Sequence, residues 1–299
     1  LPRQIRNDAV IAKRYRIERV LGAGGMGVVA AAEDVKTGTP VAIKFLIHHA
    51  AGEYDGLLER FVREAQALLR VQSEHVVRVL DVGNLANGAP FIVMERLEGE
   101  DLNAALHSRG PLSPEEVVDA LAQACIAVAA AHACGIIHRD LKPANLFMTR
   151  QPNGAGVLKV LDFGVSKLGE EGAPELTQAS TMVGSAYYMS PEQMNGMREL
   201  DGRSDIWSLG VTAYELLTGK LPFDGSSIAE VCAQVLYEPP KSPLLLRPDL
   251  PPALCDVVLR CLSKDREQRH ANADELAEAL LGSLPAQATT SPFTRRSAR

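Results

Sequence analysis

Several features are missing from this sequence, and each absence excludes a class of protein. The five cysteines are an odd number and form no C-x-x-C pair, which argues against a zinc site or a disulfide framework. Basic residues are not in excess: 31 Lys and Arg face 37 Asp and Glu, so a net charge of -6 offers no overall field for nucleic acid or an anionic membrane. The first residues lack the charged-then-apolar pattern of a signal peptide. We therefore expect free thiols in a cytoplasmic setting.

The chain has the length and composition of globular material. Its 299 residues are 46% hydrophobic and 23% charged, enough for one large domain or two lobes. The run 120–137 is almost continuously apolar and reaches the lower limit of a membrane span. Gln123 and His132 interrupt it, and it follows a helix-start signal at 113–116. A helix buried in a large lobe is therefore the favoured interpretation.

The stretch from Ile137 to Phe147 gathers more chemistry than any other. Asp140 can accept a proton, Lys142 can hold a phosphate oxygen, and Asn145 can ligate a hard cation through its carbonyl oxygen. An acid, a cation and an amide within six residues suit phosphoryl transfer.

A glycine-rich turn near the N-terminus has two interpretations. Gly22 to Gly27 follows a strand pattern from Tyr15, and its glycines would let backbone N–H groups approach a phosphate. The same G-x-G-x-x-G pattern opens the helix of a dinucleotide-binding unit, with an acid about 20 residues later. Here a second strand begins at Val28, and the position 22 residues after Gly22 is Lys44, on the strand-like segment 41–46. A glycine hairpin with a strand lysine beneath it is favoured.

The remaining pattern predicts strands first and helices later. An amphipathic helix is expected at about 57–71, where Glu64 would pair with Lys44, and a lobe boundary is expected near residue 98. Asp162 follows a strand at 157–161, and a long polar segment covers 165–189. Further strands are expected at 76–83 and 90–96, and helices at 102–107, 203–218, 227–237, 252–263 and 273–281.

These landmarks, in this order, resemble the protein kinase family over about residues 14–281, most closely the bacterial serine/threonine kinases of eukaryotic type. The resemblance implies an α+β fold with two lobes: a small antiparallel sheet with one key helix, then a larger and mainly helical lobe. The implied segments are an N-terminal extension at 1–13, the N-lobe at 14–97, the C-lobe at 98–282 and a linker at 283–299.

The same resemblance implies ATP and Mg²⁺ as cofactors, with Mn²⁺ as a substitute, and assigns residue roles. Asp140 orients the substrate hydroxyl and accepts its proton, Lys142 counters γ-phosphate charge, and Lys44 with Glu64 fixes the nucleotide. Asn145 and Asp162 hold the metal. Several of the proposed nucleotide contacts are equally explained as plain core. The implied nucleotide-binding residues are Leu21, Gly22, Ala23, Gly24, Gly25, Met26, Gly27, Val29, Ala42, Lys44, Met94, Glu95, Leu97 and Phe147.

Substrate class and bracing contacts also come from the resemblance. Lys142 in the Asp-Leu-Lys-Pro-Ala-Asn segment is typical of the serine/threonine branch, whose substrates are proteins. Ser185 replaces the usual threonine and keeps the hydroxyl that links to the catalytic aspartate. Glu192, in Ser-Pro-Glu rather than Ala-Pro-Glu, is expected to pair with Arg269, and Asp205 to tie down the backbone of the catalytic loop. His138 is expected to be structural, packing against Phe163.

Regulation by phosphorylation of the long polar segment is the last expectation. Arg139 directly precedes Asp140 and offers a cation to an incoming phosphate. Thr177, Ser180 and Thr181 are the candidate sites, although a Ser/Thr-rich loop can also be simply polar.

The sequence leaves other functions to be weighed. A pseudokinase scaffold usually lacks the strand lysine, the catalytic aspartate or the metal aspartate, and all three are present here. Small-molecule phosphotransferases typically have a shorter segment between the positions of Asp162 and Glu192. A Rossmann oxidoreductase is disfavoured because its glycine turn should open a helix, whereas a strand follows the glycines here. We expect protein substrates and no nucleic acid, with membrane contact only through a segment beyond this chain.

Overall fold

This computed structural model describes residues 6–24, 27–46, 68–86, 88–150, 156–163, 183–197 and 199–285. Its contacts form two units, which are described separately below. The first contains the described residues up to Gln72 together with Val77–Glu98. The second contains Ser73–Val76 and the described residues from Gly99 onward.

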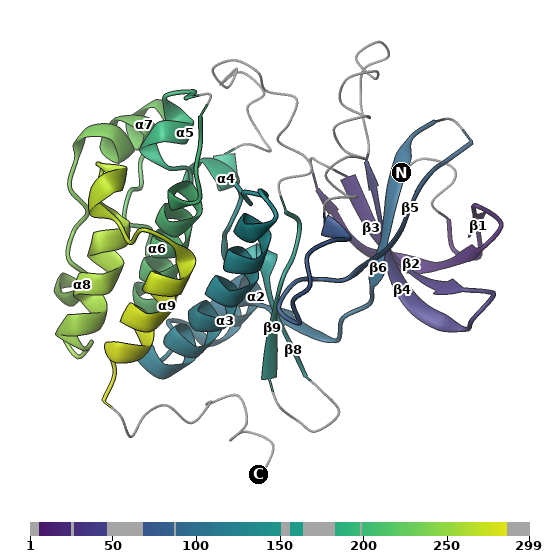
Figure 1. Ribbon diagram of the computed structural model, residues 1–299, viewed down its shortest axis with the longest axis horizontal. Coiled ribbons are helices and arrows are strands. Elements are labelled where there is room, and N and C mark those ends of the chain that lie inside the picture. The colour runs from purple at the N-terminus through teal and green to yellow at the C-terminus, as the bar shows by residue number, and fades with distance from the viewer. Residues whose placement is uncertain are drawn as a thin grey trace. The chain divides into compact units, whose positions relative to one another are not determined.

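The first unit is built on an antiparallel sheet (Figure 1). The strand order is β1-β2-β3-β4-β6-β5, and every neighbouring pair is antiparallel. The expected extension 1–13 contributes the short strand β1. The strands are β1 (Val10–Ile11), β2 (Tyr15–Gly24), β3 (Gly27–Asp34), β4 (Thr39–Leu46), β5 (Val79–Asn84) and β6 (Pro90–Glu95).

The two faces of this sheet differ. Because residues alternate along a strand, Val41, Ile43 and Phe45 of β4 point to one face. They join the buried apolar cluster that includes Phe91 and Val93 of β6. Ala42 and Lys44, at the alternate positions of β4, face away from this cluster, and the exposed fraction of Lys44 is only 8%.

The second unit is mainly helical, with one small sheet ordered β7-β8-β9 (Figure 1). The α+β expectation is therefore confirmed. Its strands are β7 (Gly99–Asp101), β8 (Leu146–Arg150) and β9 (Gly156–Val160). Its helices are α2 (Leu102–Arg109), α3 (Pro114–Ala133), α4 (Val183–Ala186), α5 (Pro191–Met194), α6 (Arg203–Thr218), α7 (Ile228–Tyr237), α8 (Pro252–Cys261) and α9 (Ala273–Gly282). Short 3₁₀ turns occur at Pro143–Asn145, Pro243–Leu245 and Arg266–Gln268.

Helix α3 is the apolar helix expected from the sequence. It begins with a full capping box, in which the Ser113 hydroxyl accepts from the backbone N–H of Glu116 and the Glu116 carboxylate accepts from that of Ser113. Within the described residues it is the one helix long and apolar enough to cross a membrane, and 56% of its most apolar window is buried. It packs beside α9 (Figure 1). These contacts support the buried-helix interpretation.

Helix α6 forms the centre of the helical unit. All but three of its 16 residues are buried, and Trp207 stacks on Phe223 with ring centroids 5.7 Å apart. The helix ends at Gly219, which adopts the left-handed φ of 70° that favours glycine. Its first turn carries Asp205, which has no exposed surface.

Some expected elements differ from the structure. Strand β5 starts at Val79, not at residue 76, because Val76 instead bridges Val160 of the second unit. Beside it, the His75 ring nitrogen Nδ1 lies 3.0 Å from the Leu158 carbonyl. Strands β7 and β8 were not expected. The predicted helix 57–71 lies outside the described residues except at its end.

Gly99 is expected to be the glycine least tolerant of substitution among those described. Its φ is +149°, and an added Cβ would lie 2.0 Å from the Met148 carbonyl oxygen on the neighbouring strand. We predict that Gly99→Ala destabilises the protein by about 3 kcal/mol, measured by urea unfolding. Gly282→Ala is the matched control, because its Cβ would meet nothing within 4 Å. Equal stability of the two variants would contradict the prediction.

Candidate active site

Asp205 holds the start of the loop that carries Asp140. Its Oδ2 accepts from the backbone N–H of His138 and its Oδ1 from that of Arg139, both at 2.8 Å. The ring nitrogen Nε2 of His132, from α3, lies 2.8 Å from Oδ2. The buried carboxylate is thus hydrogen-bonded on both oxygens, as a buried charge requires. The expected contact between Asp205 and the loop backbone is confirmed.

His138 is a structural residue, as expected. Its ring lies 4.6 Å from the Phe163 ring, centroid to centroid. Nε2 lies 2.8 Å from the Leu161 carbonyl, so Nε2 carries the proton and Nδ1 accepts from the Asp140 N–H at 3.2 Å. Burial lowers the pKa of His138, which favours this neutral form. The ring therefore fixes the Asp140 backbone without shuttling protons.

Asp140 is surrounded by the partners that the motif supplies. Lys142 Nζ donates to Asp140 Oδ2 and to Ser185 Oγ, each at 2.8 Å. Asn145 Nδ2 donates to the Asp140 carbonyl at 2.7 Å and to its Oδ2 at 3.3 Å. Ser185 is therefore connected to the carboxylate through Lys142, which explains how serine can stand where the family usually has threonine.

A hydrogen bond between backbone groups brings the chain near the two candidate metal ligands, Asn145 and Asp162, together. The Leu161 N–H donates to the Asn145 carbonyl at 2.8 Å, so the residue before Asp162 runs beside Asn145. Asp162 has a positive φ of 52°, uncommon for a residue other than glycine. Backbone in this region recurs at functional sites, where the surroundings must enforce it.

The donor set near Asn145 fits a hard divalent cation. The side-chain nitrogen Nδ2 of Asn145 is directed at Asp140, so the side-chain oxygen Oδ1 is the atom suited to a metal. Asp162 would add a carboxylate oxygen. Among the described residues, no three His, Cys, Asp or Glu side chains are gathered for a metal. A site made of one amide and one carboxylate would need further oxygens, such as those of phosphates or water.

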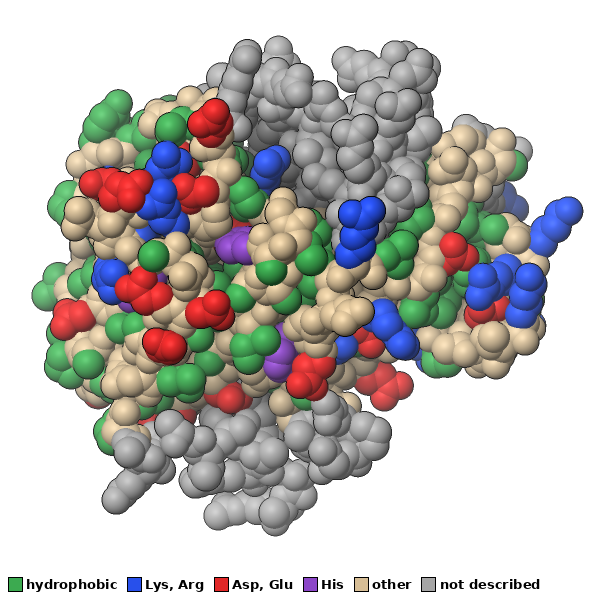
Figure 2. Space-filling model, viewed as in Figure 1, with side chains coloured by type: hydrophobic (Ala, Val, Ile, Leu, Met, Phe, Trp, Pro, Cys, Tyr) green, Lys and Arg blue, Asp and Glu red, His purple; other side chains and the backbone are tan. Residues whose placement is uncertain are grey.

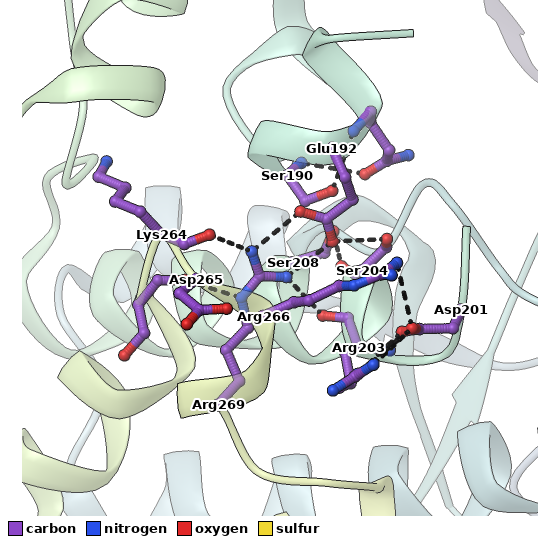
Figure 3. A network of polar contacts seen from close by, with 12 residues as sticks. Ser190, Glu192, Asp201, Arg203, Ser204, Ser208, Lys264, Asp265, Arg266 and Arg269 are labelled. Atoms are coloured by element: carbon purple, nitrogen blue, oxygen red, sulfur yellow. Dashed lines mark hydrogen bonds and ion pairs between the residues drawn. The ribbon is translucent and has the colours of Figure 1, made fainter. Parts of the chain in front are cut away.

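A second buried network braces the segment after Ser185 (Figure 3). Arg269, with a fully buried side chain, donates from both terminal nitrogens to Glu192, at 2.7 and 2.9 Å. Ser204 donates to the same carboxylate at 2.8 Å. Burial acts to raise the pKa of Glu192, but the Arg269 and Ser204 hydrogen bonds prevail and lower it. The predicted Glu192–Arg269 pair is confirmed.

Four of the predicted nucleotide contacts share one face of the first unit's sheet. Val29 is directly opposite Lys44, and Ala42 is directly opposite Met94. Ala42 and Lys44 are two residues apart on β4, so all four side chains point away from the buried cluster. The strand thus presents a nearly buried cation among apolar neighbours.

The other nucleotide candidates are more scattered. Gly24 pairs with Gly27 at the end of the predicted hairpin, and Leu21, Gly22 and Ala23 precede it on exposed backbone. Glu95 ends β6, and its N–H donates to the Arg78 carbonyl at 3.0 Å. Leu97 lies between the end of β6 and the start of β7, and half-buried Phe147 belongs to the second unit. Gly25, Met26, Glu64, Thr177, Ser180 and Thr181 lie outside the described residues.

Two hydrogen bonds around this loop were not anticipated from the sequence. His132 bonds the buried carboxylate of Asp205, and Gln193 donates to the Arg139 carbonyl at 3.1 Å. The signal for His132 was present, because it is one of two polar residues that interrupt an apolar helix. Gln193 gave no signal beyond a helix-capping pattern.

Comparisons with known proteins agree with this geometry. The family model for the protein kinase domain matches residues 15–281. The chain is 42% identical to serine/threonine-protein kinase Pkn1 of Myxococcus xanthus, over 89% of this chain and 38% of that protein. It is 39% identical to the probable serine/threonine-protein kinase PknB of Corynebacterium glutamicum, over 94% of this chain and 44% of that protein.

A solved structure shows the same likeness. The Mycobacterium tuberculosis PknI kinase domain superimposes with a TM-score of 0.73 and 27% identity, over 93% of this chain and 99% of that one. The chain spans less than half the length of the two curated relatives. The chain belongs to the protein kinase family, in its bacterial serine/threonine branch.

Proposed function

We propose that this chain is an active protein kinase domain that transfers the γ-phosphate of Mg-ATP to serine and threonine hydroxyls of proteins. The observation that carries the proposal is the Asp140–Lys142–Asn145 cluster, in which a braced loop holds the Lys142 ammonium 2.8 Å and the Asn145 amide 3.3 Å from the Asp140 carboxylate. Pseudokinases usually lack at least one of Lys44, Asp140 and Asp162, and this chain has all three.

The proposed roles follow from the contacts. Asp140 accepts the proton of the attacking hydroxyl. The hydrogen bond from Lys142 Nζ keeps the Asp140 carboxylate in place. Lys142 can also neutralise charge on the transferred group, which is the main demand of a dissociative transition state. Asn145 and Asp162 would hold Mg²⁺, which supplies charge neutralisation between phosphates when bound. Lys44 would bind the nucleotide phosphates.

Protein substrates suit the surface better than nucleic acid. The net charge is -6, and Figure 2 shows acidic and basic side chains interspersed over the helical unit on the face displayed. Phosphate backbones are bound by continuous basic surfaces. We place the domain in the cytoplasm, where Mg-ATP is available.

The test is a transfer assay with the whole chain. We expect incubation with radiolabelled Mg-ATP and a generic basic protein to label serine or threonine, identified by phosphoamino acid analysis. ATP binding with no transfer would favour the pseudokinase alternative, and binding of NAD but not ATP would overturn the proposal.

Regulation by autophosphorylation is a second part of the proposal. Arg139 lies next to the catalytic acid, and a guanidinium there can receive a phosphate. After incubation with Mg-ATP, mass spectrometry should find phosphate between Asp162 and Glu192, at Thr177, Ser180 or Thr181. No phosphate in that segment would contradict this part alone.

A further inference from the structure

Gln193, on the short helix α5, hydrogen-bonds backbone groups on two sides. Its Nε2 donates to the Arg139 carbonyl at 3.1 Å, and its Oε1 accepts from the Ser190 N–H at 3.0 Å. A carbonyl can only accept and a backbone N–H can only donate, so the two partners define which end of the amide is nitrogen. The side chain therefore joins the helix to the catalytic loop in one orientation.

The group that Gln193 holds belongs to the peptide preceding the catalytic acid. The Arg139 carbonyl and the Asp140 N–H are the two edges of one planar peptide. Gln193 holds the carbonyl edge, and His138 Nδ1 accepts from the N–H edge at 3.2 Å. Asp205 holds the N–H of the peptide before it. Every polar group of Arg139's backbone is therefore engaged by a side chain.

This restraint acts where the backbone is unfavourable. Arg139 has a φ of +64°, a conformation that residues other than glycine rarely adopt. Such a conformation persists only when surrounding contacts enforce it. Without its carbonyl partner, the 139–140 peptide could rotate toward an ordinary φ, and the Asp140 side chain would shift relative to Lys142.

We propose that Gln193 is a positioning residue for phosphate transfer, acting on Asp140 through the 139–140 peptide. The kinetic consequence rests on the proposed function, whereas the effect on the peptide does not. Helix capping alone does not explain the residue, because a glutamate at this position would complete the capping box with Ser190 equally well. Only an amide can also donate to Arg139.

That difference supplies the test. Gln193→Glu keeps an acceptor for the Ser190 N–H and removes the donor to Arg139. Ser190→Ala is the matched control, because it removes the other half of the capping box and leaves the Gln193 amide in place. Transfer should be assayed on the whole chain, with kcat and KM for Mg-ATP determined and thermal melting recorded.

We expect Gln193→Glu to lower kcat about tenfold, with KM for Mg-ATP changed less than about twofold. Ser190→Ala should lower the melting temperature while keeping kcat within about twofold of the unmodified chain. If Gln193 had only a structural role, both variants would have a lower melting temperature and neither would have a changed kcat. Unchanged kcat in Gln193→Glu, or an equal fall in both variants, would overturn the inference.

A second measurement is independent of activity. The Asp140 amide should exchange its hydrogen about tenfold faster in Gln193→Glu, followed by NMR, and at the original rate in Ser190→Ala. Unchanged exchange in Gln193→Glu would refute the restraint. If the unmodified chain transfers no phosphate, the proposed function fails, and this exchange result still decides whether Gln193 holds the peptide.

Discussion

Asp140→Asn is expected to lower phosphate transfer by about 10³-fold, within the range for a positioned general base. This corresponds to about 4 kcal/mol of lost transition-state stabilisation. Asparagine has the same shape and keeps one oxygen that can accept from Lys142 Nζ, now 2.8 Å from Oδ2. It cannot take a proton from the substrate hydroxyl. The loss should therefore appear in kcat, measured with a saturating basic protein substrate.

The controls separate chemistry from folding. Mg-ATP affinity and melting temperature should stay close to those of the unmodified chain, because the replaced group is isosteric. Asp249→Asn, at a side chain that is 69% exposed, should retain full activity. Transfer by Asp140→Asn within about threefold of the unmodified chain would remove Asp140 from the mechanism.

Arg269→Met should be the most destabilising of the substitutions considered, at about 3–5 kcal/mol, or roughly 10 °C in melting temperature. The change leaves the buried Glu192 carboxylate without its cation. It also frees the carbonyls of Ser263, Lys264 and Arg203, to which Arg269 donates. Glu192→Gln spares these carbonyls, so it should cost less. The double variant should cost less than the sum of the two.

The destabilisation caused by Arg269→Met is expected to depend on pH in a definite direction. Arg269 lowers the pKa of Glu192 below its ordinary value of 4.5, so the pair's stabilisation is present above pH 4.5 and is lost as the pH falls through the folded-state pKa. Without Arg269, burial, which is the largest influence on this pKa, should outweigh the remaining Ser204 hydrogen bond and raise the pKa above 4.5, and the variant should then lose stability as the pH rises. The difference in melting temperature between the two proteins should therefore shrink from pH 7 to pH 4.

A surface pair provides the comparison. Arg16 and Glu33 approach to 2.6 Å, as closely as the buried pair, but their side chains are 47% and 32% exposed. Arg16→Met should change stability by less than about 1 kcal/mol. If Arg16→Met and Arg269→Met were equally destabilising, burial would not be the reason for the strength of the Glu192 pair.

The longer helices of the second unit were predictable because each has local signals, whereas the four-residue helices α4 and α5 were not predicted. Expected bounds of 203–218 match α6, and 273–281 falls one residue short of α9. Strand β7 was missed because Gly99–Asp101 is short and polar. Strand β8 was missed because Leu146–Arg150 overlaps the end of the Ile137–Phe147 stretch, whose residues were interpreted by their chemistry and not by their strand pattern. Each is a strand only through its neighbours, since β8 pairs with both β7 and β9. Pairing between distant segments leaves little local trace.

The same distinction applies to the site. Asp140, Lys142 and Asn145 are recognisable because they are close in sequence, and the structure brings them together. The contacts of His132 with Asp205 and of Gln193 with Arg139 join residues 73 and 54 positions apart, which no local pattern encodes. The family resemblance supplied the distant Glu192–Arg269 pair, but composition and periodicity alone could not.

The short segment Ser73–Val76 has a consequence for how the chain is made. It lies between residues of the first unit, yet His75 contacts Leu158, 83 residues later. During synthesis on a ribosome, all six strands of the first sheet have been made once the chain has grown past Glu95. At that point the partners of His75 and Val76 on β9 have not yet been synthesised. Such delayed long-range contacts slow folding. The two units are therefore expected to complete folding together, not one after the other.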